Sequence, residues 1–267
     1  MKLVIQILKE QFMNLRLIFQ LSIYDIKSKY SKHYLGIFWQ FLNPFIQISI
    51  YWLIFGLGFR KGHPVDDVPY FIWLVVGLIP WFFITPSIIQ GSNSIYAKVN
   101  LVSKMKFPVS VLPTVSIVSN SFNFLVMLII MGIFLFVNKV NPGMYILQLP
   151  YYLLCLYVFL FSITLLFSTI SVLVRDFQLA LQSFMRMLFY VTPILWVPGD
   201  LPHLAEQILK LNPIYYLAIG FRHTFIEKIW FFEDMSFTLY FWMITLVILF
   251  IGAAVHTKFK NKFVDYL

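Results

Sequence analysis

The chain has 267 residues, of which 60% are hydrophobic and only 12% are charged, and its formal net charge is +9. This composition excludes an ordinary soluble domain, in which about a quarter of the residues are charged. The sequence therefore predicts an integral membrane protein.

Residues 1–33 are predicted to form an amphipathic helix. Their apolar residues recur at helical spacing, while the charged residues fall elsewhere, so this helix is expected to lie in the membrane interface. A sharp turn must follow before the chain can cross the membrane, and Gly36 is suited to it. The apolar positions are Leu3, Val4, Ile7, Leu8, Phe12, Leu15 and Phe19.

Residues 34–267 are predicted to form a membrane domain with six transmembrane helices. Five windows contain no Asp, Glu, Lys or Arg, and each exceeds the roughly 20 residues that cross a hydrocarbon core. A sixth is interrupted only by Arg186. The runs lack the alternation of barrel strands, so the predicted fold is all-α. The windows are 34–59, 68–97, 107–138, 140–174, 177–199 and 235–257.

Two of the connections are predicted to contain helices. Residues 92–107, between the second and third spans, are polar and basic. Residues 197–230 hold two apolar pieces, 201–211 and 214–229, that are too short or too charged to cross. We expect them to dip into the outer leaflet and return, which is tolerated only where protein or water covers the backbone.

The distribution of positive charge predicts the orientation. With six spans, 13 of the 20 Lys and Arg residues lie on the side of the termini, and six of these precede Tyr34. Positive charge is enriched in cytoplasmic segments, so both termini are expected in the cytoplasm and the protein in the plasma membrane. The basic charge thus indicates contact with anionic lipids rather than nucleic acid.

The sequence predicts no catalytic residue, no metal site and no cofactor in this chain. It contains no GxxxxGK[ST] motif for nucleotide phosphates and no HExxH motif. Arg186 is either a functional charge at depth or a side chain that reaches the cytoplasmic surface. The spans contain no carboxylate, which disfavours an ion-coupled transporter, so the energy for transport is expected to come from another subunit.

Aromatic residues are unusually frequent, at 52 of 267. Lipid contact and interfacial anchoring explain most of them. A subset in the first and fifth spans is predicted to line a passage for sugars, whose C–H faces stack on aromatic rings. The candidates, with one polar neighbour, are Trp39, Phe41, Asn43, Tyr51, Phe55, Phe184, Phe189 and Tyr190.

Five motifs occur in order along the chain: DIKSKYSKHYLGIFWQFLNPF, KMKFPVSVLP, RDF, TPI and LNPIYYLAIGFRHTF. In this order the sequence resembles the ABC-2 permeases that export lipid-linked polysaccharides. It looks most like the teichoic-acid export permeases of Gram-positive bacteria, which are relatives of O-antigen and capsule export permeases.

The resemblance implies a homodimer bound to two copies of a separate cytoplasmic ATPase, which would hold ATP and Mg. The first and fifth spans would enclose the channel, and the coupling helix would contact the ATPase. Its candidate residues are Ser92, Tyr96, Lys98, Asn100, Lys104, Lys106 and Phe107. The outer gate would comprise Leu211, Asn212, Pro213, Tyr215, Tyr216 and Arg222.

The resemblance also implies a role for the junction before the first span: the diphosphate of a polyprenyl-linked substrate would enter there. Relatives often have Arg where this chain has Lys29, and Lys offers a point charge rather than a planar fork. Alternatively, the basic residues of this junction only fix the orientation of the chain in the membrane, and Asp25 pairs with Lys29 within the helix. The entrance residues would be Lys27, Lys29, Tyr30, Lys32, Tyr34, Leu35 and Gly36.

The resemblance thus implies an exporter of an undecaprenyl-diphosphate-linked polymer, a teichoic acid precursor. One alternative is an ABC-2 exporter of drugs or small lipids, which would have fewer aromatic residues along the first and fifth spans. Another is a membrane-embedded transferase that modifies the polymer, which would need a catalytic acid or histidine at depth. A secondary transporter is the last alternative.

Overall fold

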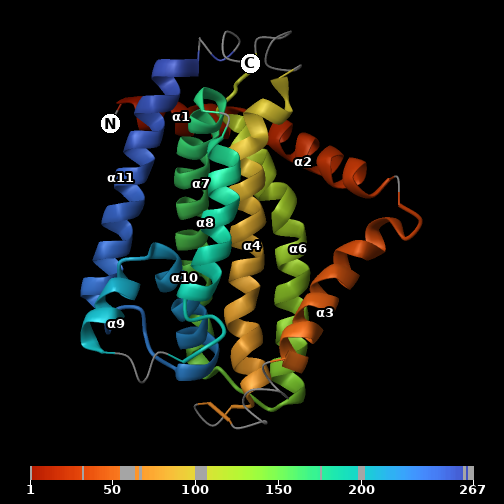
Figure 1. The fold of residues 1–267 in the computed structure, drawn as a ribbon, viewed down its shortest axis with the longest axis vertical. Helices are drawn as coiled ribbons and strands as arrows, with labels where there is room; N and C mark the ends of the chain where they lie inside the picture. The colour runs from red at the N-terminus through yellow and green to blue at the C-terminus, as the bar shows by residue number, and fades with distance from the viewer. Residues whose placement is uncertain are drawn as a thin grey trace.

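The computed structural model describes residues 2–31, 33–54, 64–65, 68–99, 107–174, 176–197, 202–260 and 263. Within these ranges the chain is helical apart from turns, short connections and an isolated bridge between Val65 and Val68. Figure 1 shows an upright bundle, with α1 across one end and α9 at the other. The predicted all-α fold is confirmed for the described residues.

Four helical segments are long and apolar enough to cross a membrane: α4 (Tyr70–Ala97), α6 (Val111–Val137), α7 (Leu149–Leu173, extended by a 3₁₀ turn from Gly143) and α11 (Met235–Phe259). The apolar side chains of α4 are the most buried of the four, and it lies between α6 and α7 in Figure 1. The protein is therefore a multi-pass membrane protein.

The six-span prediction is not confirmed, because two expected spans are short. Helices α3 (Trp39–Tyr51) and α8 (Phe177–Val191) have 13 and 15 residues, or about 20 and 22 Å at about 1.5 Å per residue. A π-helical turn extends α3 to residue 54. Helix α8 ends because Thr192 is extended, at φ −71° and ψ 130°, as a residue before proline prefers.

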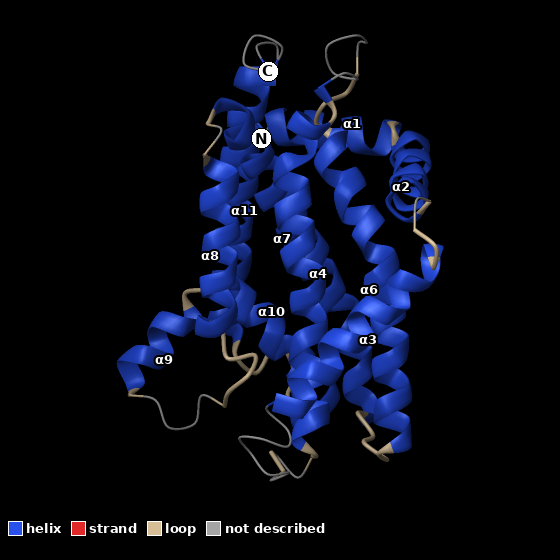
Figure 2. Ribbon diagram, turned by 45° about the vertical axis from the view of Figure 1, so that its right-hand side comes forward, coloured by secondary structure: helices blue, strands red, loops and turns tan. Residues whose placement is uncertain are grey.

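The predicted single helix over residues 1–33 is wrong in one respect, because the chain bends at Asn14. Helix α1 (Lys2–Met13) lies across one end of the bundle, and α2 (Leu15–Tyr30) slopes away from it (Figures 1 and 2). Asn14 has φ −111° and ψ 20°, outside the helical region. Ile7 packs against α7 and α11, while Ile18 packs against α6.

Hydrogen bonds fix α1 to the beginning of α6. The Ser110 hydroxyl donates to Glu10 Oε2 at 2.7 Å, and Gln11 Nε2 donates to the Ser110 carbonyl at 3.0 Å. Thr114 Oγ1 donates to Gln11 Oε1 at 2.8 Å. Lys260 Nζ, just beyond α11, is 3.9 Å from Glu10 Oε1. The first and last helices therefore meet at the same end of the bundle.

Two short helices occupy the opposite half, in the predicted outer segment. They are α9 (His203–Lys210) and α10 (Pro213–Arg222), and a π-helix (His223–Glu227) follows α10. Asn212 caps α10 by accepting from the Ile214 N–H at 3.0 Å, and it donates to Thr192 Oγ1 at 3.0 Å. This contact joins α10 to the end of α8.

Gly220 sets how closely α10 approaches α7. A Cβ atom at this position would overlap the ring of Tyr152. We expect Gly220→Ala to cost about 1–3 kcal/mol through overpacking and to lower the melting temperature of the purified protein in detergent. Gly132→Ala is the control, because a Cβ there meets nothing within 4 Å. Equal melting of Gly220→Ala and the wild type would contradict the packing described here.

Candidate functional site

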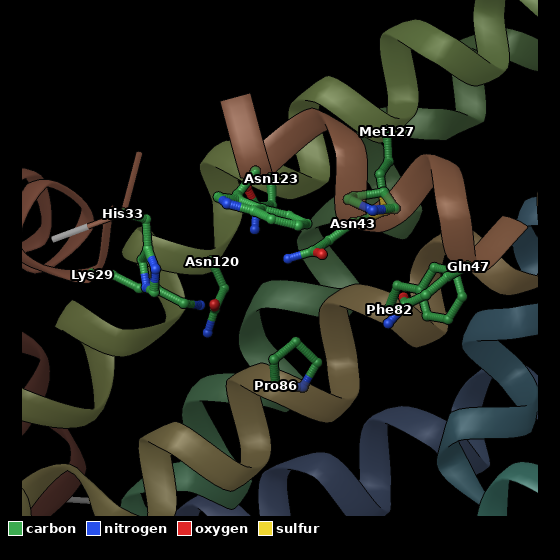
Figure 3. A pocket seen from close by; sticks show the side chains of 11 residues that line it. Lys29, His33, Asn43, Gln47, Phe82, Pro86, Asn120, Asn123 and Met127 are labelled. Carbon is green, nitrogen blue, oxygen red and sulfur yellow. The ribbon is translucent and has the colours of Figure 1, made fainter. Parts of the chain in front are cut away.

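A polar groove lies between the end of α2 and helices α3, α4 and α6 (Figure 3). It consists of a cavity of about 490 Å³ and a smaller one of about 80 Å³, and both are lined by Lys29, Asn120 and Asn123. We call the two together the amide groove. Its defining polar side chains are Lys29, Gln40, Asn43, Gln47, Gln90, Asn120 and Asn123.

The groove arises from helical periodicity on three helices. Helix α3 supplies Gln40, Asn43 and Gln47, spaced by three and four residues, so they share one face. Helix α6 supplies Asn120 and Asn123 in the same way. Amides are costly against lipid, so the favourable packing turns these faces toward one another.

The hydrogen-bonding capacity of the groove is only partly used within the protein. Asn120 is buried, and its Nδ2 donates to Gln90 Oε1 at 3.3 Å. Gln40 is only 2% exposed, yet its Oε1 accepts no hydrogen bond from the described residues. The buried Oδ1 atom of Asn123 also accepts none from them. A buried acceptor without a donor costs about 1–3 kcal/mol. These two oxygens are therefore a local destabilising feature in the wall of the groove.

A lysine ammonium group supplies positive charge at the α2 side of the groove. Lys29 and His33 line the larger cavity, and Figure 3 shows them side by side. Protein atoms around the Lys29 ammonium lower its pKa below the ordinary 10.5 through burial, although part of the side chain remains exposed. A bound anion would offset this cost. Among the described residues, no carboxylate lines the larger cavity.

Asp25 has a different partner from the one predicted. Its carboxylate accepts from Lys98 Nζ at 2.7 Å, whereas the sequence suggested Lys29. Lys98 follows the last residue of α4, so the ion pair joins α2 to the end of α4. Asp25 also lines the smaller cavity, which places this ion pair at the edge of the groove.

Of the predicted entrance residues, Lys29 lies in the groove. Lys27 is exposed on the last turn of α2, and Tyr34 and Leu35 are also exposed. Gly36 has φ 48°, a left-handed conformation that favours glycine, and it begins the short 3₁₀ helix that leads into α3. The predicted turn is therefore present. Lys32 and the side chain of Tyr30 lie outside the described residues.

The predicted channel residues fall into three groups. Trp39 and Asn43 line the groove. Tyr51 instead packs on Phe189, with ring centroids 5.6 Å apart, and Phe189 is buried. The exposed faces of single helices carry Phe41, Phe184 and Tyr190, while Phe55 lies outside the described residues. The seven candidates that the structure describes thus do not line one surface of a single chain.

The first residues of the predicted coupling segment, which starts at Ser92, still belong to helix α4. Helix α4 continues to Ala97, and Ser92 is fully buried, donating to Gln178 Oε1 at 2.8 Å. Phe107 packs in a small apolar cluster with Ile95. Ser92 therefore stabilises the bundle rather than facing a partner. Tyr96 is exposed and Lys98 pairs with Asp25, while Asn100, Lys104 and Lys106 lie outside the described residues.

Arg222, predicted at the outer gate, is the only buried Lys, Arg, Asp or Glu in the part of the chain that the structure describes. Its Nη1 donates to the Pro193 carbonyl at 2.6 Å, and its Nη2 donates to the Ile194 carbonyl at 2.8 Å. The guanidinium lies 3.4 Å from the ring centroid of Trp73. Arg222 therefore clamps α10 to the chain that follows α8, and its place in an outer gate stays a prediction.

The other outer-gate candidates differ in burial: some lie inside the bundle and others at its surface. The Tyr216 hydroxyl is 2.9 Å from that of Tyr151 and 3.1 Å from Thr238 Oγ1, inside the bundle. Tyr215 is also buried, whereas Leu211 is exposed. Pro213 is the first residue of α10. Arg186, on the exposed face of α8, donates to Ser183 Oγ at 3.2 Å.

Sequence reasoning missed most of the groove. Its amides were visible as polar positions at helical spacing inside apolar windows, but no single motif marks them. The missed residues are Gln40, Gln47, Gln90, Asn120 and Asn123. No group of three or more His, Cys, Asp or Glu residues suited to a metal occurs within the described ranges.

A helical multi-pass membrane protein with a polar groove between its spans has the architecture of a membrane permease. The chain belongs to the ABC-2 type transporter family, whose model matches residues 16–226. ABC-2 permeases work with ATPase partner subunits, which implies a cytoplasmic ABC ATPase as a partner of this chain.

The chain is similar to proteins that are named for the export or transport of polysaccharides. It is 28% identical to the O-antigen export system permease protein RfbA of Klebsiella pneumoniae, over 91% of this chain and 92% of that protein. RfbA of Myxococcus xanthus is 28% identical over 84% and 85% of the two chains. The polysialic acid transport protein KpsM of Escherichia coli is 23% identical over 87% and 89%.

Proposed function

We propose that this protein is the permease subunit of an ATP-driven exporter that moves a lipid-linked polysaccharide out of the cell. The observation that carries the proposal is its similarity, over most of its length, to permeases named for O-antigen and polysialic acid transport. The polar groove supports it, because an exporter of apolar drugs or small lipids has no need of a cavity lined by carboxamides.

The proposed assembly is a homodimer with two cytoplasmic ATPase subunits that bind ATP and Mg. The proposal places the second copy beside α3 and α8, whose exposed faces carry Phe41, Phe184 and Tyr190. In this assembly α1 and the end of α11 lie on the cytoplasmic side, as the positive charge of the terminal segments suggests.

The proposed cargo carries an undecaprenyl diphosphate, which enters beside Lys29 and the turn at Gly36. The ammonium group of Lys29 at the groove supports an anionic group there. A teichoic acid precursor is the particular polymer we propose. Its alternatives are the polymers for which the relatives are named, and flipping of each lipid-linked polymer in liposomes distinguishes them.

The first test is purification of the tagged protein from its native membrane in mild detergent. We expect an ATPase with a phosphate-binding loop to co-purify in equal amount. Replacing residues 100–106 by a Gly-Ser linker should release it, whereas the same replacement of residues 60–66, predicted on the opposite side, should not. A permease that repeatedly purifies without an ATPase would contradict the proposal and favour a secondary transporter or a membrane enzyme.

A further inference from the structure

A single carboxamide interrupts the apolar face that α8 turns toward the bundle. The buried residues of α8 are Leu181, Met185 and Phe189, which are four residues apart and therefore form one stripe along the helix. Gln178 lies three residues before Leu181, so it begins the same stripe. Placing a carboxamide among apolar side chains is unfavourable unless the amide is hydrogen-bonded. Gln178 therefore needs partners on the helices that this stripe faces.

The partners of Gln178 lie on two other helices, α4 and α7, which are beside α8 in Figure 1. Gln178 Nε2 donates to the Ile89 carbonyl of α4 at 2.9 Å, and Gln178 Oε1 accepts from Ser92 Oγ of α4 at 2.8 Å. Ser171 Oγ of α7 donates to the same Oε1 at 3.4 Å. In the part of the chain that the structure describes, no other side chain of α8 is hydrogen-bonded to another helix. Gln178 is therefore the polar link between the first turn of α8 and these two helices.

The end of α4 leads directly into the segment that is proposed to contact the ATPase. Ile89 and Ser92 lie in the last three turns of α4, which ends at Ala97. At the same level α4 is packed closely on α7, because a Cβ atom on Gly91 would come within 2.7 Å of Thr164 Cγ2. Such close packing transmits a displacement of one helix to its neighbour. Through Gln178, α8 is attached to both helices of this closely packed pair.

We propose that Gln178 is a positioning residue for transport, which makes the first turn of α8 follow the end of α4 when the ATPase displaces the segment after Ala97. This inference rests on the proposed function, in which a second copy of the chain lies beside α8. Hydrogen bonds between side chains of neighbouring helices contribute only modestly to the stability of membrane proteins. The role of Gln178 therefore lies in coupling ATP hydrolysis to export rather than in holding the protein folded.

The test uses the purified permease–ATPase complex in liposomes, with the lipid-linked polysaccharide isolated from the native membrane as the probe. Gln178→Met keeps the length of the side chain and removes its hydrogen bonds to α4. We expect export per ATP hydrolysed to fall by about tenfold, which is within the range that two interhelical hydrogen bonds can supply. The KM for ATP should not change. Gln182→Met is the matched control, because Gln182 lies one turn further along α8, is half-buried and makes no side-chain hydrogen bond to the described residues.

The partner on α4 provides an independent variant. Ser92→Ala removes the hydroxyl that reaches Gln178 Oε1 and should lower export per ATP hydrolysed by about threefold. Added to Gln178→Met, it should cause no further loss, because both substitutions break the same contact. Ser94→Ala is its control, since the Ser94 hydroxyl is also buried on α4 but donates within that helix, to the Gly91 carbonyl at 2.7 Å. If Gln178→Met does not fold, Ser92→Ala alone tests the inference.

Thermal unfolding in detergent separates a positioning role from a merely structural one. A structural role would lower the melting temperature and the amount of folded complex, but the complex that remains would export as much per ATP as the wild type. Unchanged export per ATP in folded Gln178→Met, or in Ser92→Ala, would overturn the inference and leave the export function standing. An equal loss in the Gln182→Met control would also overturn it. Absence of export by the wild-type complex would overturn the proposed function, and the inference with it.

Discussion

Replacing Arg222 by methionine is expected to destabilise the protein strongly and to abolish export. The substitution leaves the carbonyls of Pro193 and Ile194 without their donor in a buried position. Hydrogen bonds from charged groups contribute about 1.5–3 kcal/mol each, so we expect a loss of about 3 kcal/mol or more. The measurement is thermal unfolding of the purified variant in detergent, followed by size-exclusion chromatography.

Two further variants test the geometry of the clamp. Arg222→Lys keeps the charge but loses the planar fork that reaches two carbonyls while lying on Trp73, so it should rescue only part of the stability. Gly77→Ala places a Cβ atom 2.6 Å from Arg222 Nη2 and should displace the guanidinium. Arg186→Met is the control, because Arg186 is exposed. If Arg222→Met melts like this control, the clamp is not a stabilising contact.

Reversing one charge of the Asp25–Lys98 pair is expected to uncouple ATP hydrolysis from export. Lys98 follows α4 at the beginning of the segment proposed to contact the ATPase, and Asp25 lies one helical turn before Lys29 on α2. A movement of the end of α4 would therefore reach the groove through this 2.7 Å contact. We expect Asp25→Lys and Lys98→Asp each to lower export per ATP hydrolysed by about tenfold, about 1.4 kcal/mol of coupling.

The double exchange, Asp25→Lys with Lys98→Asp, provides the decisive control. It restores an ion pair of reversed polarity, so export per ATP should recover most of the way. Because the pair is only partly buried, its own contribution to stability is about 1 kcal/mol or less, and all three variants should fold. A double variant that exports no better than either single variant would show that the charges act separately.

The helical membrane fold was predictable because long windows without charged residues can be identified directly in the amino-acid sequence. The lengths of α3 and α8 were not, since windows 34–59 and 177–199 also contain non-helical backbone. Apolar composition does not report where a helix ends inside the membrane. Thr192-Pro193 is the local signal that predicts where α8 ends, and α8 does end at Val191.

The candidate site was predictable only in part. Lys29 and the turn at Gly36 stand out because charge and glycine are rare in this chain. The partners of Asp25 and Arg222 depend on contacts over 73 and about 29 residues of sequence, which no local pattern contains. The amide groove likewise requires α3, α4 and α6 to meet, and each helix alone shows only scattered polar residues.

The shortness of α8 changes the thickness of the apolar layer beside it. A helix of 15 residues spans about 22 Å, less than the roughly 30 Å of a hydrocarbon core. The bilayer beside it must become thinner to match, so that water can approach more closely from both sides. For the polysaccharide that we propose as cargo, the low-dielectric layer is thinnest beside α8, where the energetic cost of desolvating each hydroxyl extends over the shortest distance.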